Sequence, residues 1–388
     1  MKRILILAAC LLALLSCGKQ KTTVSVRDLA AIVTERGLAV ANPGDYRGSI
    51  LHYGMAEYAL ASGDSLYFND LVERLLAYGR GEVEMYARNN FINFDAGGIG
   101  AYLLAFQGCD TLRAQVLENY ARMWAEQPRS TDNVMNAIHN QKNNRVFIDM
   151  LASVTPANLY GGLLEGDREK IDYAVDVTLY LYDILHDDAT GLVHQARGYG
   201  DPEHISEDCW SRGNGWGALA LMSLMKDLPA DHPRRAEVED LCASFFSSLV
   251  KFQDRKGLWH QEITDLSSYP EVSGTAFILG GLGSAIETGI LPAKKYRKAF
   301  VKGLQGMLSY IDPDGSVGHT CKGCLNPGEG TKEDYKAMPY YYNEDHSFGP
   351  VRFALAQALR LGIESVEICG PLGYANEGDR VEKPVKKQ

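Results

Sequence analysis

The segment Trp210–Trp216 reads WSRGNGW and concentrates residues that suit sugar binding. Indole faces stack on the C–H faces of a sugar ring, and the guanidinium of Arg212 can hold a carboxylate through two parallel hydrogen bonds. Glycine also lets the backbone approach a ligand closely. Trp210, Arg212 and Trp216 are therefore predicted to form one wall of a site for an acidic sugar. The alternative is a loop that leads into the apolar helix at 217–225, with both tryptophans in the core.

The elements that must position this wall are helices. From Val26 onward, apolar residues recur at spacings of three and four, as in SLYFNDLVERLLAYGR (65–80) and EVEDLCASFFSSLVKFQ (237–253). This spacing is typical of helices that bury one face, and alternating strand patterns are scarce. Ten or more such segments, joined by loops rich in Gly, Asp, Asn and Pro, predict an all-α fold. The fold would be either a solenoid or a closed ring of helix hairpins.

A short repeat indicates stacked hairpins. GLVHQA at 191–196 recurs as GLWHQE at 257–262, each time after a helix end and a charged turn. Equivalent loops at one end of successive helix pairs would produce such a repeat. A chance match is the alternative.

The composition limits the kind of ligand. The 388 residues, of which 46% are hydrophobic, can bury a large core in one large domain or two. A net charge of −10 argues against a broad basic surface, and therefore against nucleic acid as a partner. An anionic ligand would have to meet a local cation in a pocket, which suits a short oligosaccharide with one charged end.

The first residues predict export. Two basic residues precede an apolar run at 4–15 that is too short to span a bilayer comfortably, and Ser16 and Cys17 follow it. LLSC resembles the lipobox of bacterial lipoproteins, in which Cys17 becomes the lipidated first residue. We therefore expect a membrane-tethered lipoprotein in the periplasm or on the cell surface. An ordinary signal peptide with a chance cysteine is the alternative.

Six cysteines lie beyond this segment. An exported compartment permits disulfides, but a core of this size does not depend on them. Cys321 and Cys324 form a CxxC motif with no second pair and no HxxxH nearby, so a local disulfide or two loop cysteines is favoured over a metal site.

Three stretches together resemble the unsaturated uronyl hydrolases, which comprise the unsaturated rhamnogalacturonyl hydrolases (glycoside hydrolase family 105) and the unsaturated glucuronyl hydrolases (family 88). The stretches are WSRGNGW, the run from GLWHQ to YPEVSGTAF, and the segment 312–356, which contains NEDHSFGP. The resemblance covers most of the chain after Val26 and implies an (α/α)6 barrel whose loops on one side form the pocket. The expected signal peptide, linker, catalytic domain and polar C-terminal tail are 1–17, 18–25, 26–372 and 373–388.

The resemblance also implies an unusual reaction. The substrate is the unsaturated uronic acid left by a polysaccharide lyase, an enol ether whose C4=C5 double bond is conjugated to its carboxylate. Protonation at C4 makes an oxocarbenium-like centre at C5, water adds there, and the hemiketal opens to expel the remaining sugar. One carboxyl group can deliver the proton and then help to deprotonate the water. No metal or organic cofactor is expected.

Two aspartates resemble the family's acidic positions. Asp149, in NNRVFIDMLAS, resembles the catalytic aspartate, with Phe147 where a tryptophan is frequent. Its apolar neighbours should raise its pKa and keep a fraction of it protonated near neutral pH, unless it only caps a helix. Asp95, in NFDAGGIGAYLL, matches the second acidic position and is expected to bind a hydroxyl or steady positive charge. Asp95 followed by AGG is also a good helix cap.

Other side chains are expected to bind the substrate. By the resemblance, Arg212 contacts the carboxylate, Trp210 the ring, and Trp216 the pocket wall. His139 resembles a substrate-binding histidine, although a lone histidine is often structural. His346 in NEDHSFGP precedes an apolar helix and is expected, with its neighbour Asp345, at the edge of the site.

The first GL-x-HQ loop departs from the family pattern. Its histidine comes one place earlier than in many relatives, so either His194 or Gln195 could face the pocket. The residues around the second loop are expected to be scaffold and hydrogen-bond support. They are His260, Glu271, Ser273 and Thr275.

Two other functions stay open at this point. One is an (α/α)6 glycosidase on saturated sugars, for which Asp95 and Asp149 would be the two carboxylates. The other is a non-catalytic sugar-binding surface lipoprotein, since such proteins are also helical and rich in aromatic residues.

Overall fold

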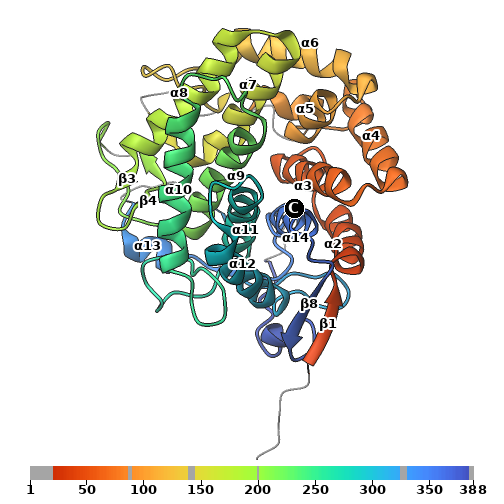
Figure 1. The fold of residues 1–388 in the computed structure, drawn as a ribbon, viewed down its shortest axis with the longest axis vertical. Helices are drawn as coiled ribbons and strands as arrows, with labels where there is room; N and C mark the ends of the chain where they lie inside the picture. Colours follow the sequence, from red (N-terminus) through yellow and green to blue (C-terminus); the bar gives the residue numbers. More distant parts are fainter. Residues whose placement is uncertain (1–20, 86–89, 139–144, 199–200, 324–329, 384–388) are drawn as a thin grey trace, which may run out of the picture.

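The computed structural model describes residues 21–85, 90–138, 145–198, 201–323 and 330–383. Within these ranges, two concentric layers of helices form a ring (Figure 1). The inner helices are α3 (Tyr46–Ser62), α5 (Ile99–Phe106), α7 (Leu151–Glu165), α9 (Ser211–Asp227), α11 (Val272–Glu287) and α14 (Phe348–Arg360). The outer helices are α2 (Val26–Val40), α4 (Ser65–Gly79), α6 (Asp110–Glu126), α8 (Arg168–Ile184), α10 (Arg235–Lys251) and α12 (Ala293–Leu308).

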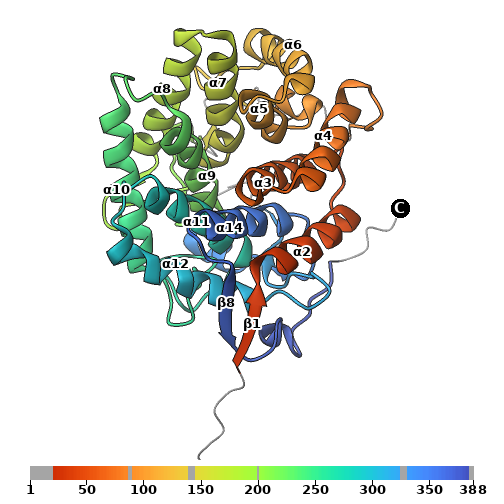
Figure 2. The ribbon, with the colours of Figure 1, turned by 45° about the vertical axis from the view of Figure 1, so that its right-hand side comes forward.

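The ring is closed. Each outer helix leads along the chain to an inner helix, so the building unit is a helix hairpin. The inner helices pack in chain order from α3 through α5, α7, α9 and α11 to α14, and α14 packs back against α3. The turned view shows the same arrangement (Figure 2). The predicted (α/α)6 barrel of hairpins is therefore confirmed, and the open solenoid is excluded.

The two layers differ because their residues differ. Every residue of α11 from Val272 to Ile286 is buried, and its sequence is apolar or small all round. The outer helix α12 buries a stripe that includes Tyr296, Phe300 and Leu304, and leaves its lysines on the other face. A helix that is apolar all round belongs inside a structure, and an amphipathic one belongs at its surface.

Helix α7 has no counterpart among the helices that apolar spacing predicts. It contains Pro156, and Gly161 and Gly162 follow in its second half, so its intrinsic helix propensity is low. The packing explains the glycines, because a Cβ atom at Gly161 would lie 2.4 Å from the ring of Tyr120. Tertiary contacts therefore override local propensity here.

Helix α9 begins at Ser211, six residues before the predicted apolar segment, so most of WSRGNGW is helical. A Cβ atom at Gly215 would lie 2.9 Å from Cβ of Phe277, and one at Gly274 would lie 2.4 Å from Oγ of Ser211. Gly215 lets α9 pack closely against α11, because a side chain at this position would collide with Phe277. Helix packing therefore explains Gly215, and the approach of backbone to a ligand at the glycines of WSRGNGW stays a prediction.

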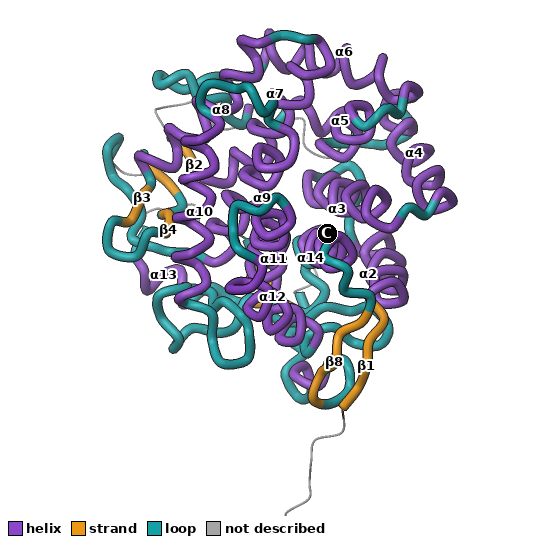
Figure 3. The backbone as a smooth tube through the Cα atoms, viewed as in Figure 1, coloured by secondary structure: helices purple, strands orange, loops and turns teal. Residues whose placement is uncertain are grey.

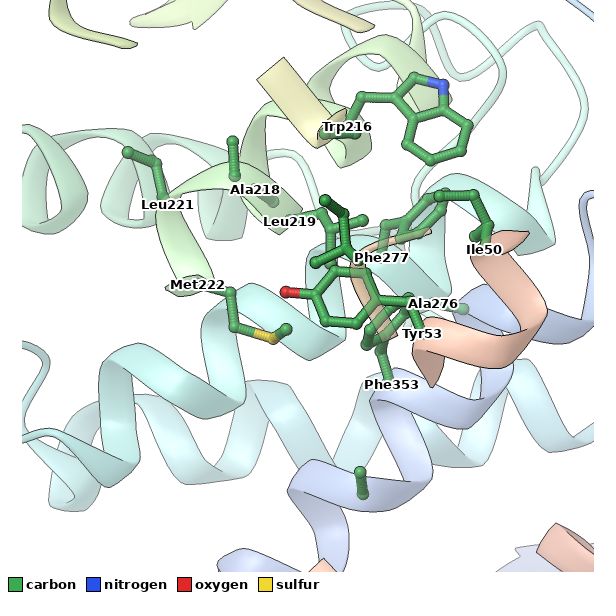
Figure 4. Close-up of a cluster of buried hydrophobic side chains, with 14 of the residues drawn as sticks. Ile50, Tyr53, Trp216, Ala218, Leu219, Leu221, Met222, Ala276, Phe277 and Phe353 are labelled. Atoms are coloured by element: carbon green, nitrogen blue, oxygen red, sulfur yellow. The ribbon is translucent and has the colours of Figure 1, made fainter. Parts of the chain in front are cut away.

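Side chains from four inner helices form one buried cluster (Figure 4). The rings of Trp216 and Phe277 have centroids 4.4 Å apart, and those of Tyr53 and Phe353 are 4.9 Å apart. Leu219 and its neighbours complete the cluster. These four helices are therefore joined by a packed apolar core.

The two ends of the ring differ. All inner helices run in the same direction, so their C-terminal ends meet at one end. There the buried carboxylate of Glu57 accepts hydrogen bonds from Lys226 at 2.7 Å and Arg360 at 3.1 Å. Although burial raises the pKa of Glu57, these two cations hold it below its usual value. The ion pairs join α3, α9 and α14 at the end where cations also suit the helix dipoles.

Short strands lie in the segments between the helices, and β1 and β8 lie at the edge of the ring (Figure 3). Strand β1 (Lys21–Ser25) pairs antiparallel with β8 (Ser365–Cys369), with Val24 opposite Val366. Three further two-stranded pairs join β2 (Val146–Phe147) to β5 (Ala196–Arg197), β3 (His186–Asp187) to β4 (Leu192–Val193), and β6 (Thr320–Cys321) to β7 (Tyr340–Tyr341). None of the helices in the described ranges combines the length and apolar character that a membrane crossing requires.

The predicted domain limits shift at both ends. Residues 21–25, expected as linker, form β1 and belong to the domain. Residues 373–383, expected as a polar tail, pack on it: Asn376 is buried, and Asp379 lies 2.8 Å from the Nε2 atom of His319. The predicted signal peptide and Cys17 lie outside the described residues.

Candidate active site

A cavity of about 270 Å³ opens where the N-terminal ends of the inner helices meet. Phe91, Phe94 and Phe147 contribute much of its apolar lining. Most of its polar and indole groups come from four inner helices or the residues just before them, and they include Tyr46, Asp149, Trp210, Arg212, Trp216 and His346. This volume is slightly below the roughly 300–1,000 Å³ of pockets for drug-sized ligands, and it suits one sugar ring. Five of the predicted site residues are thereby brought together.

The sequence repeat is structural. His194 Nδ1 lies 2.8 Å from the carbonyl oxygen of Asp208, and His260 Nδ1 lies 2.5 Å from that of Ser268. Both histidines therefore fasten their own loops and do not line the cavity. The structure therefore gives no support to the expectation that His194 binds substrate.

The same repeat also positions Asp149 and Arg212 through backbone hydrogen bonds. The backbone nitrogen of Ile148 donates to the carbonyl of Gln195 at 2.9 Å, and the backbone nitrogen of Ser211 donates to that of Gln261 at 2.9 Å. Asp149 and Arg212 each follow the donating residue, so they occupy equivalent positions at the starts of α7 and α9. The predicted acid and the predicted cation are therefore presented side by side by one repeated backbone arrangement.

Asp149 lies in the short 3-10 helix Ile148–Met150 and is half-buried at the cavity wall. Burial raises its pKa to about 7, since a hydrogen bond from Gln195 and the charge of Arg212 offset only part of the desolvation. Its flanking residues Ile148 and Met150 are buried. Among the described residues that line the cavity, Asp149 is the only carboxyl group.

Gln195 is the residue of its loop that reaches the acid. Its Nε2 atom lies 3.5 and 3.4 Å from the two carboxylate oxygens of Asp149. Its Oε1 atom accepts a hydrogen bond from Tyr335, a residue of α13 (Lys332–Lys336). Because the carbonyl end of the amide is occupied by Tyr335, the amine end is directed at Asp149.

Asp208 supports this arrangement from behind and was not singled out by the sequence. Its Oδ2 atom accepts from the backbone nitrogen of Trp210 at 3.0 Å, and Oδ1 accepts from that of Gln195 at 3.4 Å. Asp208 therefore fixes two residues of the site through their backbones. Its position two residues before Trp210, the first residue of WSRGNGW, was the available signal.

Arg212 is buried, with one side of its guanidinium anchored. Nη1 donates to the carbonyl of Cys321 at 2.6 Å and to Ser273 Oγ at 3.2 Å. Nε and Nη2, the two donors of the adjacent edge, have no hydrogen-bond partner in the described structure. The Cζ atom also lies 4.9 Å from the ring centroid of Trp210. A buried, unpaired two-donor edge beside a cavity matches the geometry of a carboxylate.

Glu271 and Ser273 have the supporting role that the sequence predicts for them. Glu271 caps α11 by accepting from the backbone nitrogens of Ser273 and Gly274. The hydroxyl of Ser273 donates to Glu271 at 2.6 Å and accepts from Arg212. These contacts fix the guanidinium without entering the cavity.

His346 lines the cavity and connects two residues that the sequence did not identify. Its Nε2 atom lies 2.5 Å from Tyr46 Oη, and its Nδ1 atom lies 2.5 Å from Glu344 Oε2. Tyr46 is the first residue of α3, far from His346 in the chain, so no local motif links them.

Asp95 is a further predicted site residue that does not line the cavity. Asp95 lies in the 3-10 helix Ile92–Ala96 and forms an ion pair with Arg122 of α6, and it is not among the lining residues. The structure therefore does not support a role for Asp95 in the chemistry. His139 lies outside the described residues, as does Cys324, while Cys321 is a buried free cysteine. Over the described ranges, no group of three His, Cys, Asp or Glu residues is placed to hold a metal ion.

Comparison with known proteins gives one family and several relatives. The model of Glycosyl Hydrolase Family 88 matches residues 25–362. An unsaturated rhamnogalacturonyl hydrolase of Bacillus subtilis is 31% identical over 180 residues, 46% of this chain and 49% of that protein. An unsaturated 3S-rhamnoglycuronyl hydrolase of Formosa agariphila is 33% identical over 111 residues, 28% of this chain and 29% of that protein. The matched segments span about half or less of these relatives.

A solved structure supports the fold. A possible member of family GH105 from Salmonella enterica superposes with a TM-score of 0.74 at 21% identity, and the match covers 87% of this chain and 95% of that one. At this identity the likeness concerns the fold alone, and it agrees with the closed ring of hairpins.

Replacing Arg212 with lysine should weaken the binding of glucuronate by roughly tenfold to a hundredfold, the loss expected for a charged hydrogen-bonded contact. An ammonium group cannot reproduce the planar two-donor edge formed by Nε and Nη2. Isothermal titration calorimetry with glucuronate, and with neutral glucose for comparison, measures the effect.

Arg197→Lys is the matched control. Arg197 is buried like Arg212, but it forms an ion pair with Asp132 and does not line the cavity. This variant should bind glucuronate as the parent does. An equal loss of glucuronate and glucose binding in Arg212→Lys would show that Arg212 does not contact the carboxylate.

Proposed function

Since the chain belongs to glycosyl hydrolase family 88, we propose that it is a glycoside hydrolase acting on oligosaccharides that end in an unsaturated uronic acid. In this proposal it hydrates the C4=C5 double bond that a polysaccharide lyase leaves and so releases the uronate from the next sugar. The observation that carries the proposal is the pairing, in one cavity, of the unpaired edge of Arg212 with Asp149, the one protonatable carboxyl among the described lining residues. The names of the relatives, which describe unsaturated uronyl substrates, support the substrate class.

Arg212 orients the substrate. Its free edge holds the carboxylate on C5, while the indole of Trp210 and the floor formed by Trp216 contact the ring faces. A cation beside this carboxylate does not itself deliver a proton. Its contribution is to place the conjugated double bond within reach of the acid.

Asp149 is the general acid. A carboxyl with a pKa of about 7 carries a proton for much of the time at neutral pH, whereas an ordinary aspartate does not. Its transfer to C4 starts the hydration, and positive charge then develops at C5 in a cavity walled by aromatic faces.

The arrangement favours hydration over a two-carboxylate mechanism. Direct hydrolysis by retention or inversion uses two carboxyl groups that flank the scissile bond. The described lining residues supply one, and Asp95 is engaged with Arg122 elsewhere.

We further propose that the protein is lipid-anchored at Cys17 and acts in the periplasm or at the cell surface. The basic start, the short apolar run and LLSC support this. Cells grown with a labelled fatty acid should incorporate it into the protein, and a Cys17→Ala variant should carry no label. Equal labelling of both would refute the anchor.

The reaction itself is tested with oligosaccharides made by polysaccharide lyases. Turnover should remove the ultraviolet absorbance of the conjugated double bond, because C4 and C5 become saturated. In heavy water the product should carry one deuterium at C4, since that proton comes from solvent through Asp149. Released uronate that keeps its double bond would establish direct glycosidic hydrolysis. Affinity without turnover on every lyase product would establish a binding protein.

Asp149→Asn should lower kcat by roughly 10²–10⁴-fold with the fold intact, because an amide of the same size cannot donate the proton. In the parent, activity should fall as the pH rises through about 7, where Asp149 loses its proton. Rate measurements across pH on both proteins check the assignment.

Asp95→Asn provides the control, because Asp95 is a second aspartate at a helix start but lies outside the cavity lining. It should stay within about tenfold of the parent, a barrier change of ~1.4 kcal/mol. A loss as large as that of Asp149→Asn would restore the two-carboxylate mechanism.

A further inference from the structure

A second set of proton-handling groups faces the same cavity. We call Tyr46, His346 and Glu344 the Tyr46 relay. Tyr46 Oη is 2.5 Å from His346 Nε2, and His346 Nδ1 is 2.5 Å from Glu344 Oε2. Tyr46 and His346 line the cavity together with Asp149, whereas Glu344 lies behind them and is fully buried.

The direction of the hydrogens in the relay follows from its chemistry. A carboxylate can only accept, so Nδ1 of His346 carries a hydrogen toward Glu344. Burial, together with the charges of Arg212 and Arg47, lowers the pKa of His346 more than Glu344 raises it, so the ring is neutral at pH 7. Nε2 then holds a lone pair, and Tyr46 donates its hydrogen to it. The phenol oxygen can therefore offer a group in the cavity only an acceptor.

Glu344 is held as an anion. Burial raises its pKa, but His346 and Arg212 hold it well below its usual value. The same carboxylate accepts from the backbone nitrogen of His346 at 2.8 Å and from Lys383 Nζ at 3.2 Å. A fixed anion behind a neutral imidazole favours proton uptake by that imidazole.

We propose that the Tyr46 relay is the base of the hydration, with Tyr46 as a further catalytic residue and with His346 and Glu344 as positioning residues. This rests on the proposed function and extends it. Two groups in one site, one held protonated and one held ready to accept, divide the acid and base roles between them. Asp149 alone would otherwise have to perform both in turn.

The step balances as follows. Asp149 gives its proton to C4, and the oxygen of water bonds to C5. Tyr46 accepts one proton of that water while its own proton passes to His346. In the collapse, the C5 hydroxyl returns a proton to Asp149 as the C5–ring-oxygen bond breaks. C1 then becomes an aldehyde, and the departing sugar oxygen takes the proton of His346 through Tyr46. Both groups end as they began.

The test uses Tyr46→Phe, which keeps the ring and removes the phenol. Its kcat on a lyase product should fall about 100-fold, the lower range for a lost general base, with KM within about threefold. The parent should lose activity at acid pH as His346 gains a proton, and this acid limb should be absent from Tyr46→Phe. Glu344→Gln should lower kcat and move the acid limb to lower pH, because the anion that favours the imidazolium is gone.

Tyr78→Phe is the matched control. Tyr78 Oη lies 3.3 Å from His52 Nδ1, so it forms another buried tyrosine–histidine contact, but outside the cavity. This variant should keep the kcat and pH profile of the parent. Circular dichroism and thermal unfolding establish that each variant is folded.

The outcomes separate the two proposals. If the parent consumes the double bond while Tyr46→Phe keeps its kcat within about threefold and keeps the acid limb, the relay is wrong and the proposed function stands. A loss confined to KM also overturns the relay, since Tyr46 would then only bind. A parent that consumes the double bond of no lyase product overturns both proposals. If Tyr46→Phe does not fold, Glu344→Gln decides by the same criteria.

Discussion

Burial of the Asp149 carboxyl is the constraint on which the site depends. Moving its pKa from 3.8 to about 7 means that ionisation costs roughly 4 kcal/mol more than in water. The nearby charge of Arg212 acts against this, because a cation favours the carboxylate. The structure keeps the balance on the protonated side by flanking the carboxyl with buried apolar residues. The hydrogen bond from the amide of Gln195 favours the carboxylate and offsets only part of this effect.

The packing of α7 against α9 sets the distance between Asp149 and Arg212. Asp149 and Arg212 occupy equivalent positions at the starts of neighbouring inner helices, and packed helices lie about 8–10 Å apart. The Gly215 and Gly274 contacts set how closely the next pair, α9 and α11, can approach. Ser273 of α11 and the carbonyl of Cys321 accept hydrogen bonds from the guanidinium of Arg212. The geometry of the site thus depends on the same helix packing that builds the ring.

Much of this could be predicted from the sequence, and the failures have physical causes. Periodicity found the amphipathic outer helices and most inner ones, but α7 was missed because packing against Tyr120, not local propensity, stabilises a segment with Pro156 and two glycines. Local motifs identified the wall around Arg212. They could not decide between His194 and Gln195, since that choice depends on Tyr335, which lies 140 residues away from Gln195. The ion pair of Asp95 could not be predicted for the same reason, because its partner Arg122 belongs to another hairpin.

The ring closes where its first inner helix meets its last. Tyr46 and His346 are 300 residues apart and form a hydrogen bond across this junction. Arg352 also donates to the carbonyl of Ala30 there, and β1 pairs with β8 beside the junction. Contacts of such long sequence separation form late and slowly, because the intervening chain must be ordered first. During synthesis, α3 emerges with one side unpartnered until the C-terminal hairpin is complete. The hairpins that carry Asp149 and Arg212 can pack together before the ring closes. The cavity around these residues is complete only after the last hairpin has packed against α3, because His346 belongs to its lining. Catalytic competence is therefore acquired at the end of folding, so that a partly folded chain would not be active.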